Sequence, residues 1–187
     1  MQKFFDDFDS LNRFSLSLDF HQDRVKCAFC SKNNQFISHG IIYKQRSSQL
    51  AEKIGKRLFC SNRYGRRGCG HTVQLYVANE FPSFRYNASH WFIFITALLA
   101  HLPVKKAYFK ATGQSTSRNA WRWLLCLELK LSQFRTFLKN SVDNLSDSFQ
   151  SRARRLQILL PTLLQLQRSF KDNICCGYQL AQQDAFI

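Results

Sequence analysis

The sequence is short of acidic residues and of long apolar runs. It has 12 Asp and Glu against 27 Lys and Arg, which gives a net charge of +15. An excess of this size repels itself in the folded state and favours a polyanionic partner, either nucleic acid or an anionic membrane surface. The most apolar run covers 14 residues, 91–104, and includes His101 and Pro103. A membrane span needs about 20 apolar residues, so we expect a buried core helix here and no membrane partner.

The chain of 187 residues contains seven cysteines. This number is odd and too small for a disulfide-stapled miniprotein. Residues 1–14 lack the apolar stretch of a secretory signal and contain three Asp. We therefore expect a cytoplasmic protein whose thiols are free, metal-bound or buried. The glycine-rich nucleotide-binding motifs and the zinc-protease motif are absent as well.

The positive charge is concentrated in the middle of the chain. Residues 21–75 carry a net charge of +9 and residues 81–140 one of +8, whereas residues 1–20 sum to −2 and residues 141–187 to +1. Charge that only keeps a protein soluble is more often mixed in sign and dispersed. An apolar content of 45% is enough for a core and excludes wholesale disorder. We predict an acidic segment (1–20), a zinc-ribbon-like domain (21–80), a helix-turn-helix domain (81–140) and a helical tail (141–187).

Four cysteines in the first basic block have the pattern of a metal site. Cys27 and Cys30 form a C-x2-C pair, whose two thiolates can face one centre from a tight turn. Cys60 and Cys69 supply a second pair that is stretched to x8, and His71 is a candidate substitute ligand. The alternative is that these are four unrelated buried cysteines. We favour a Zn²⁺ site, because a metal replaces much of the core that about 55 residues struggle to build.

The remainder of this block predicts a β-rich fold. Residues 36–43 and 72–77 are expected to be strands, and residues 45–56 a polar loop or short helix. The insertion between Cys60 and Cys69 should form a basic loop beside the metal. Its three cations are Arg63, Arg66 and Arg67.

The second basic block predicts helices. Residues 88–102 form the first, with Ser89 as N-cap, and Pro103 suits the first turn of a second helix over 104–112. Gly113 follows at the C-terminal capping position. A third helix, 118–140, is capped by one of residues 115–117. Its apolar face recurs in steps of four and three at Ala120, Leu124, Leu127, Leu131, Phe134 and Leu138.

A helix, a short turn containing glycine and a second helix are typical of the helix-turn-helix motif. The start of the second helix would then enter the major groove, where Arg grips guanine and Asn or Gln grips adenine. The alternative is an ordinary pair of core helices with solvated arginines. Bulky Phe109, four residues before Gly113, predicts open packing of this pair. With the three arginines of the cysteine insertion included, the candidate DNA-binding residues are Arg63, Arg66, Arg67, Lys105, Lys106, Gln114, Ser115, Ser117, Arg118, Asn119 and Arg122.

The cysteine-rich stretch ending in RLFCSNRYGRRGCGHT, followed by VKKAYFKATGQSTSRNAWRW, resembles the N-terminal DNA-binding region of bacterial insertion-sequence transposases. The resemblance covers roughly residues 26–140, and the x8 spacing departs from the usual second C-x2-C. It implies sequence-specific binding of double-stranded DNA by a mobile-element protein, with zinc on the four cysteines. Such transposases hold two Mg²⁺ on three carboxylates, and the 47 residues after 140 contain four Asp and no Glu. We therefore expect no enzymatic activity, but a regulator or an end-recognition subunit that works with a separate transposase.

In the tail, Leu156, Leu159, Leu163, Leu166 and Phe170 form one apolar stripe, which Pro161 should interrupt with a kink or a break into two helices. The stripe either covers the core helices or forms a homodimer. Two other functions stay open for the whole chain: an RNA-binding or ribonucleoprotein structural protein, and an adaptor in a larger transposition or defence complex. The predicted fold class is α+β, a small β-rich zinc ribbon followed by an all-α bundle.

Overall fold

The computed structural model describes residues 2–19, 25–46, 50–82, 84–138, 152–170 and 172–187. Residues 139–140 of the predicted third helix and residues 141–151 of the predicted tail lie outside this set. Within it, the chain is a mixture of α and β structure, with one four-stranded sheet and seven helices. It divides into two compact units: unit 1 comprises Met1–Arg85 with Gln179–Ala185, and unit 2 comprises Tyr86–Tyr178 with Phe186–Ile187.

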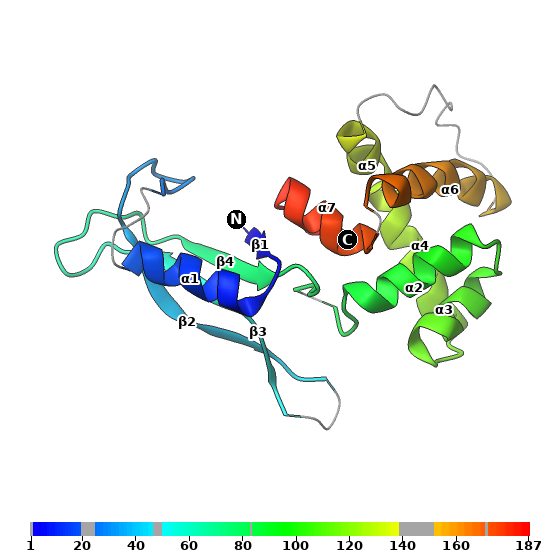
Figure 1. Ribbon diagram of the computed structural model, residues 1–187, viewed down its shortest axis with the longest axis horizontal. Coiled ribbons are helices and arrows are strands. Elements are labelled where there is room, and N and C mark those ends of the chain that lie inside the picture. The colour runs from blue at the N-terminus through cyan, green and yellow to red at the C-terminus, as the bar shows by residue number, and fades with distance from the viewer. Residues whose placement is uncertain (1, 20–24, 47–49, 83, 139–151, 171) are drawn as a thin grey trace. The chain divides into compact units, whose positions relative to one another are not determined.

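Unit 1 is built on a sheet with the strand order β1-β4-β3-β2 (Figure 1). Strand β1 (Gln2–Phe5) pairs in parallel with β4 (Thr72–Val77), and β4, β3 (Glu52–Cys60) and β2 (Phe36–Lys44) form an antiparallel meander. Helix α1 (Phe8–Asp19) crosses the face of the sheet and contacts every strand. The segment predicted as an acidic N-terminal part is therefore a strand and a helix of unit 1.

The strand predictions at 36–43 and 72–77 are confirmed, whereas the prediction of a loop or short helix over 45–56 is wrong from residue 52 onward. Residues 52–56 begin strand β3, although they lack the alternation of a half-buried strand. Their partner is β2, with Tyr43 opposite Lys53 and Ile42 opposite Gly55. Cross-strand pairing has overridden the local polarity of this stretch.

The core of unit 1 lies between α1 and the sheet. Its buried members are Leu11 and Leu18 from α1, together with the strand and loop residues Cys27, Phe36, Leu58, Cys60, Val73 and Leu75. Two of the cysteines are thus part of the core itself. The other two, Cys30 and Cys69, are partly buried against it.

Unit 2 is helical. Its described elements are α2 (Ala88–Leu99), α3 (Val104–Thr112), α4 (Ser117–Leu129), α5 (Leu131–Phe137), α6 (Arg152–Ser169) and the first residues of α7 (Ile174–Gln182). Trp123 of α4 lies at the centre of the first three helices. Its ring stacks on Trp91 of α2, with centroids 4.0 Å apart, and meets Phe94 and Tyr108 edge to face. Aromatic packing therefore joins α2, α3 and α4.

Several details of the predicted helices are corrected. Asn87, not Ser89, caps α2: its Oδ1 accepts a hydrogen bond from the His90 N–H at 3.3 Å. The predicted third helix is two helices, α4 and α5, which meet at Lys130. Pro161 lies inside α6, which continues through it as one helix, so the expected break into two helices is wrong.

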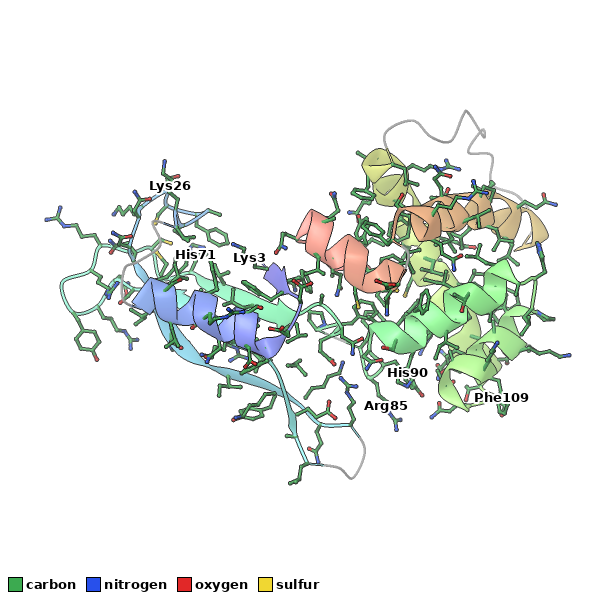
Figure 2. All side chains as sticks on the ribbon, viewed as in Figure 1. Lys3, Lys26, His71, Arg85, His90 and Phe109 are labelled. Atoms are coloured by element: carbon green, nitrogen blue, oxygen red, sulfur yellow. The ribbon has the colours of Figure 1, made fainter. Side chains whose placement is uncertain are left out.

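Other helix predictions are confirmed. Gly113 ends α3 in the left-handed conformation, with φ 69°, and donates its N–H to the Phe109 carbonyl. The expectation that Phe109 opens the packing of α3 and α4 is an exception, because this side chain points away from the core and is 56% exposed (Figure 2). In the tail, Leu159, Leu163 and Leu166 are fully buried, and α6 contacts α2, α4 and α5. This favours the interpretation of the stripe as a core face.

Candidate metal centre

The first cysteine pair is set in a tight turn. The Cys27 N–H donates to the Lys32 carbonyl at 3.0 Å, and the Ser31 N–H donates back to the Cys27 carbonyl at 2.7 Å. Ser31 adopts the left-handed conformation, with φ 57°. This closed turn directs the Sγ atoms of Cys27 and Cys30 toward the same side, as the C-x2-C spacing predicts.

The second pair forms despite its long spacing. Gly68 N–H donates to the Ser61 carbonyl at 2.7 Å, and Gly70 N–H donates to the Cys60 carbonyl at 2.9 Å. These bonds close the insertion into a loop, so that Cys69 lies beside Cys60. Gly68 is required there, because a Cβ at this position would lie 2.3 Å from the Ser61 carbonyl oxygen. The long x8 spacing is therefore compatible with two cysteines that lie side by side.

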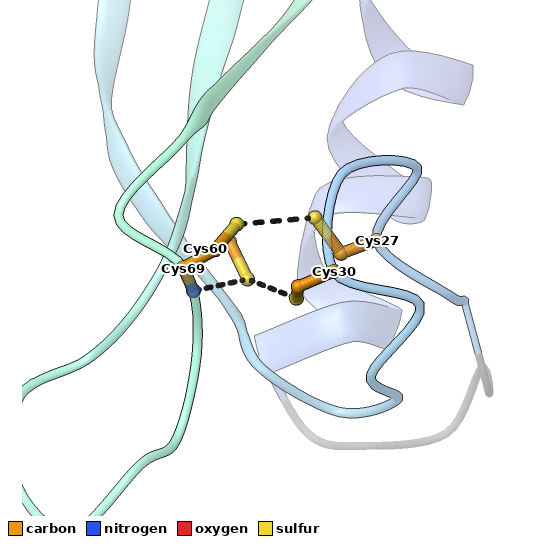
Figure 3. Close-up of side chains that lie close together, drawn as sticks. All are labelled: Cys27, Cys30, Cys60 and Cys69. Atoms are coloured by element: carbon orange, nitrogen blue, oxygen red, sulfur yellow. Dashed lines mark hydrogen bonds between the residues drawn. The ribbon is translucent and has the colours of Figure 1, made fainter.

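The four sulfurs form one cluster (Figure 3). Cys27 Sγ lies 3.6 Å from Cys69 Sγ, Cys30 Sγ lies 3.7 Å from Cys60 Sγ, and all four sulfurs lie within 4.8 Å of one another. A disulfide would need about 2.05 Å. A tetrahedral metal with bonds of about 2.3 Å holds its sulfurs about 3.8 Å apart. The prediction that these cysteines come together is confirmed, and the cluster can hold a metal ion.

The thiols differ in their acidity. Burial raises the pKa of Cys27, but the backbone N–H groups of Cys30 and Phe29 and the neighbouring thiols outweigh it and bring this pKa down to about 7. Burial raises the pKa of Cys60 to about 12. The thiol of Cys27 is therefore more acidic than that of Cys60. A bound cation would supply the positive charge that a fully deprotonated cluster requires.

His71 lies beside the cluster rather than in it. Its Nδ1 is 3.3 Å from Cys69 Sγ, and its ring stacks on Phe29 with centroids 4.1 Å apart. All four cysteines contribute to the cluster, so His71 does not replace one of them. In the tautomer that carries its proton on Nδ1, His71 would donate to this sulfur and stabilise a thiolate there.

The three arginines predicted beside the metal lie in the insertion. Arg63 and Arg67 are exposed, and Arg66 is half-buried, with its Nη1 donating to the Asn34 carbonyl at 2.9 Å. Arg63 lies over the Phe59 ring at 5.9 Å. The insertion therefore presents positive charge next to the sulfur cluster.

The helical candidates are arranged along α3 and α4. Lys105 and Lys106 are exposed in the first turn of α3, and Ser115 is exposed in the turn between the helices. On α4, Ser117, Arg118 and Arg122 are exposed. Gln114 and Asn119 are half-buried. The opposite face of α4 is buried in the core through Ala120, Trp123, Leu124 and Leu127.

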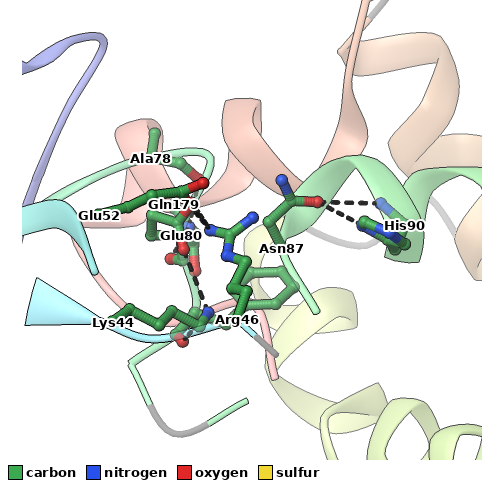
Figure 4. A network of polar contacts seen from close by, with 9 residues as sticks. Lys44, Arg46, Glu52, Ala78, Glu80, Asn87, His90 and Gln179 are labelled. Carbon is green, nitrogen blue, oxygen red and sulfur yellow. Dashed lines mark hydrogen bonds and ion pairs between the residues drawn. The ribbon is translucent and has the colours of Figure 1, made fainter. Parts of the chain in front are cut away.

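Two cations of unit 1 are held internally. Glu80 is buried, and its carboxylate accepts hydrogen bonds from Lys44 Nζ at 3.1 Å and from Arg46 (Figure 4). Arg46 also pairs with Glu52 at 3.5 Å. Burial lowers the pKa of Lys44, and the Glu80 charge opposes that shift. Sequence reasoning missed this network, which ties β2 to the segment after β4 and withdraws two charges from the basic surface.

Side chains of the C-terminal segment support unit 1. Gln183 Oε1 accepts from the Phe4 N–H at 2.7 Å, and its Nε2 donates to the Phe4 carbonyl at 3.1 Å. Gln179 Nε2 donates to the Ala78 carbonyl at 2.6 Å (Figure 4). Gln183 thus pairs with the outer edge of β1 in place of another strand. No sequence pattern signals these contacts.

No helix in the described part of the chain is long and apolar enough to cross a membrane. The described chain thus consists of a mixed unit, whose four clustered cysteines could hold a metal ion, and a helical second unit. A comparison with known proteins found no matching family model, no matching curated protein and no matching solved structure.

Proposed function

We propose that this chain is a zinc-stabilised protein that binds double-stranded DNA sequence-specifically. In this proposal it belongs to the transposase-related, mobile-element type. It acts as a regulator or end-recognition subunit. The observation that carries the proposal is the exposed basic start of α4 on a helix whose other face is locked into an aromatic core.

The start of α4 has the chemistry of a recognition helix. Arg118 and Arg122 lie one turn apart and are both exposed, while Ala120 and Trp123 between and beside them are buried. Gly113 and the three residues after it form the short turn that leads from α3 into α4. A rigid helix that presents arginines from its first turns suits insertion into a major groove. Lys105 and Lys106 on α3 suit contacts with the phosphate backbone.

Zinc is the metal that the donor set favours. Four thiolates in a closed, tetrahedral arrangement are typical of structural zinc sites, whereas oxygen-rich sets favour Mg²⁺ or Ca²⁺. Cys27 and Cys60 are buried and Cys30 and Cys69 are half-buried, which leaves no open position for a substrate among these ligands. The metal then has a structural role and holds the basic insertion in place.

A binding assay with an arginine variant tests the recognition helix. Duplexes selected from a random pool are compared with an unselected duplex by fluorescence anisotropy. Arg118→Ala should cut the preference for the selected sequence by about 5- to 150-fold, the effect of losing one bidentate base contact. Arg168→Ala removes an exposed charge at the end of α6 and is the matched control.

Lys105→Ala provides a contrast to Arg118→Ala. It should weaken binding to selected and unselected duplexes alike, because a phosphate contact carries no sequence information. The slope of the logarithm of the binding constant against the logarithm of salt concentration should fall in size by about one. A protein that binds no duplex, or whose preference survives Arg118→Ala unchanged, contradicts this account of α4.

A further inference from the structure

A basic hollow lies beside the metal centre in unit 1. It has a volume of about 870 Å³ and is lined by residues 31–35 and 64–67. This volume falls in the range of about 300–1,000 Å³ that is common for small-ligand sites. One wall follows the first cysteine pair, and the other is the insertion inside the second pair. The sulfur cluster therefore determines how the two walls face each other.

Hydrogen bonds between the walls fix the shape of the hollow. Lys32 Nζ donates to the Arg67 carbonyl at 2.7 Å, and the Arg67 N–H donates to Gln35 Oε1 at 2.8 Å. Arg66 Nη1 reaches the Asn34 carbonyl at 2.9 Å. A site whose walls are held before a ligand arrives loses less entropy on binding.

The lining has the charge of an anion site. Lys32, Arg66 and Arg67 contribute three cations, and no Asp or Glu lines the hollow. Guanidinium groups match phosphate oxygens in geometry and pair with them in a bidentate manner. The chemistry of the lining therefore fits a phosphate group.

Tyr64 adds an aromatic surface to these cations. Its side chain is 92% exposed, and its backbone has the left-handed φ of 54°, next to Gly65 at φ 77°. A ring held so far into solvent contributes almost nothing to the core. Base stacking on an exposed ring strengthens binding by about 5- to 150-fold per base and needs a base whose face is free.

We propose that this hollow binds one unpaired nucleotide. Its phosphate lies against Lys32, Arg66 and Arg67, and its base stacks on Tyr64. The inference rests on the proposed function as a nucleic-acid-binding protein and deepens it, because unit 1 then recognises an unpaired end or loop next to a duplex. A basic loop that contacted only duplex backbone would make no use of the tyrosine ring.

The test compares two labelled DNA probes on the zinc-loaded full chain: a blunt duplex, and the same duplex with a short single-stranded overhang. The protein should bind the probe with the overhang at least about fivefold more tightly than the blunt duplex, as stacking of one base implies. Tyr64→Ala should abolish this gain, whereas Tyr64→Phe should keep it. Tyr43→Ala, which removes a ring exposed on β2, is the matched control and should also keep the gain. An overhang of RNA in place of DNA shows which sugar the hollow accepts.

The outcomes separate this inference from the proposed function. If the blunt duplex binds and the overhang adds nothing, or if Tyr64→Ala retains the gain, the inference is wrong and duplex binding stands. If the overhang binds tightly and the blunt duplex does not bind, the hollow is supported and the duplex proposal is wrong. If no probe binds at all, both are wrong.

Discussion

The two units support their exposed cations in different ways. In unit 1, a modest core between α1 and the sheet ends in four sulfurs, and the basic insertion grows out of the second cysteine pair. In unit 2, Trp123 packs against rings from α2 and α3, and the basic residues lie on the outer faces of these helices. Like charges oppose folding in both units. If the sulfur cluster binds a metal, the metal offsets this repulsion in unit 1 and aromatic packing offsets it in unit 2, so the two units should respond to different substitutions.

The largest effect should come from Cys60→Ser. Cysteine ligands of a structural zinc site support about 10–16 kcal/mol of apparent binding free energy, so losing one should empty the site and disorder the adjoining loops of unit 1. The zinc content measured by metal analysis should fall from about one zinc per chain to near zero. Cys126→Ser, a change on α4 outside the cluster, should leave the zinc content unchanged. Zinc retained in Cys60→Ser would contradict the assignment of the ligands.

Trp123→Ala should have the next largest effect, on unit 2. It removes the ring that joins three helices, and the expected loss in the free energy of unfolding is about 3–5 kcal/mol. Thermal unfolding followed by circular dichroism measures this loss, and the zinc content should stay at the wild-type value. Phe109→Ala, which truncates an exposed ring on α3, should leave the unfolding midpoint nearly unchanged. Equal effects of the two variants would refute a central role for Trp123.

Gly68→Ala tests how the loop between Cys60 and Cys69 closes in unit 1. The added methyl group would meet the Ser61 carbonyl oxygen at 2.3 Å, which forces Cys69 away from Cys60. We expect the zinc affinity to fall by about 10- to 100-fold, the range seen when the supports of metal ligands are disturbed. Competition with a chelating dye measures the affinity, with Asn62→Ala in the same loop as the control. An unchanged affinity would show that the loop closes in another way.

The smallest effect should come from Gln183→Ala, which removes the two hydrogen bonds to Phe4 at the edge of β1. Each such bond has a net value of about 1 kcal/mol, so the free energy of unfolding should fall by about 1–2 kcal/mol. Denaturant unfolding compares this variant with Gln182→Ala, whose exposed side chain neighbours it. If both variants unfold alike, Gln183 does not protect the edge.

Local patterns account for the parts of the fold that were predicted correctly. The C-x2-C pair predicted the first turn, and Gly113 predicted the end of α3. Both features depend on residues that are close in sequence. Helix α1 was missed although its signal is local: Asp7 accepts from the Ser10 N–H at 2.7 Å, as an N-cap does. Asp7 was counted only toward the net negative charge of residues 1–20.

The errors arose where distant residues decide the structure. Strand β3 begins in a polar stretch because β2 pairs with it, and Gln183 reaches Phe4 across almost the whole sequence. At the metal centre, the four cysteines were found by spacing, but the closure of the x8 insertion was not. Its signal was present in the glycines on both sides of Cys69, one of which tolerates no side chain.

Hydrogen exchange with and without a chelator tests the central claim most directly, namely that a metal on Cys27, Cys30, Cys60 and Cys69 holds unit 1 together while unit 2 stands on its own core. Removing the metal should abolish protection in the two cysteine loops and lower it in β3 and β4. Protection in α2, α3 and α4 should be retained. If unit 1 keeps its protection after the metal is removed, or if no metal is present at the start, the account is contradicted.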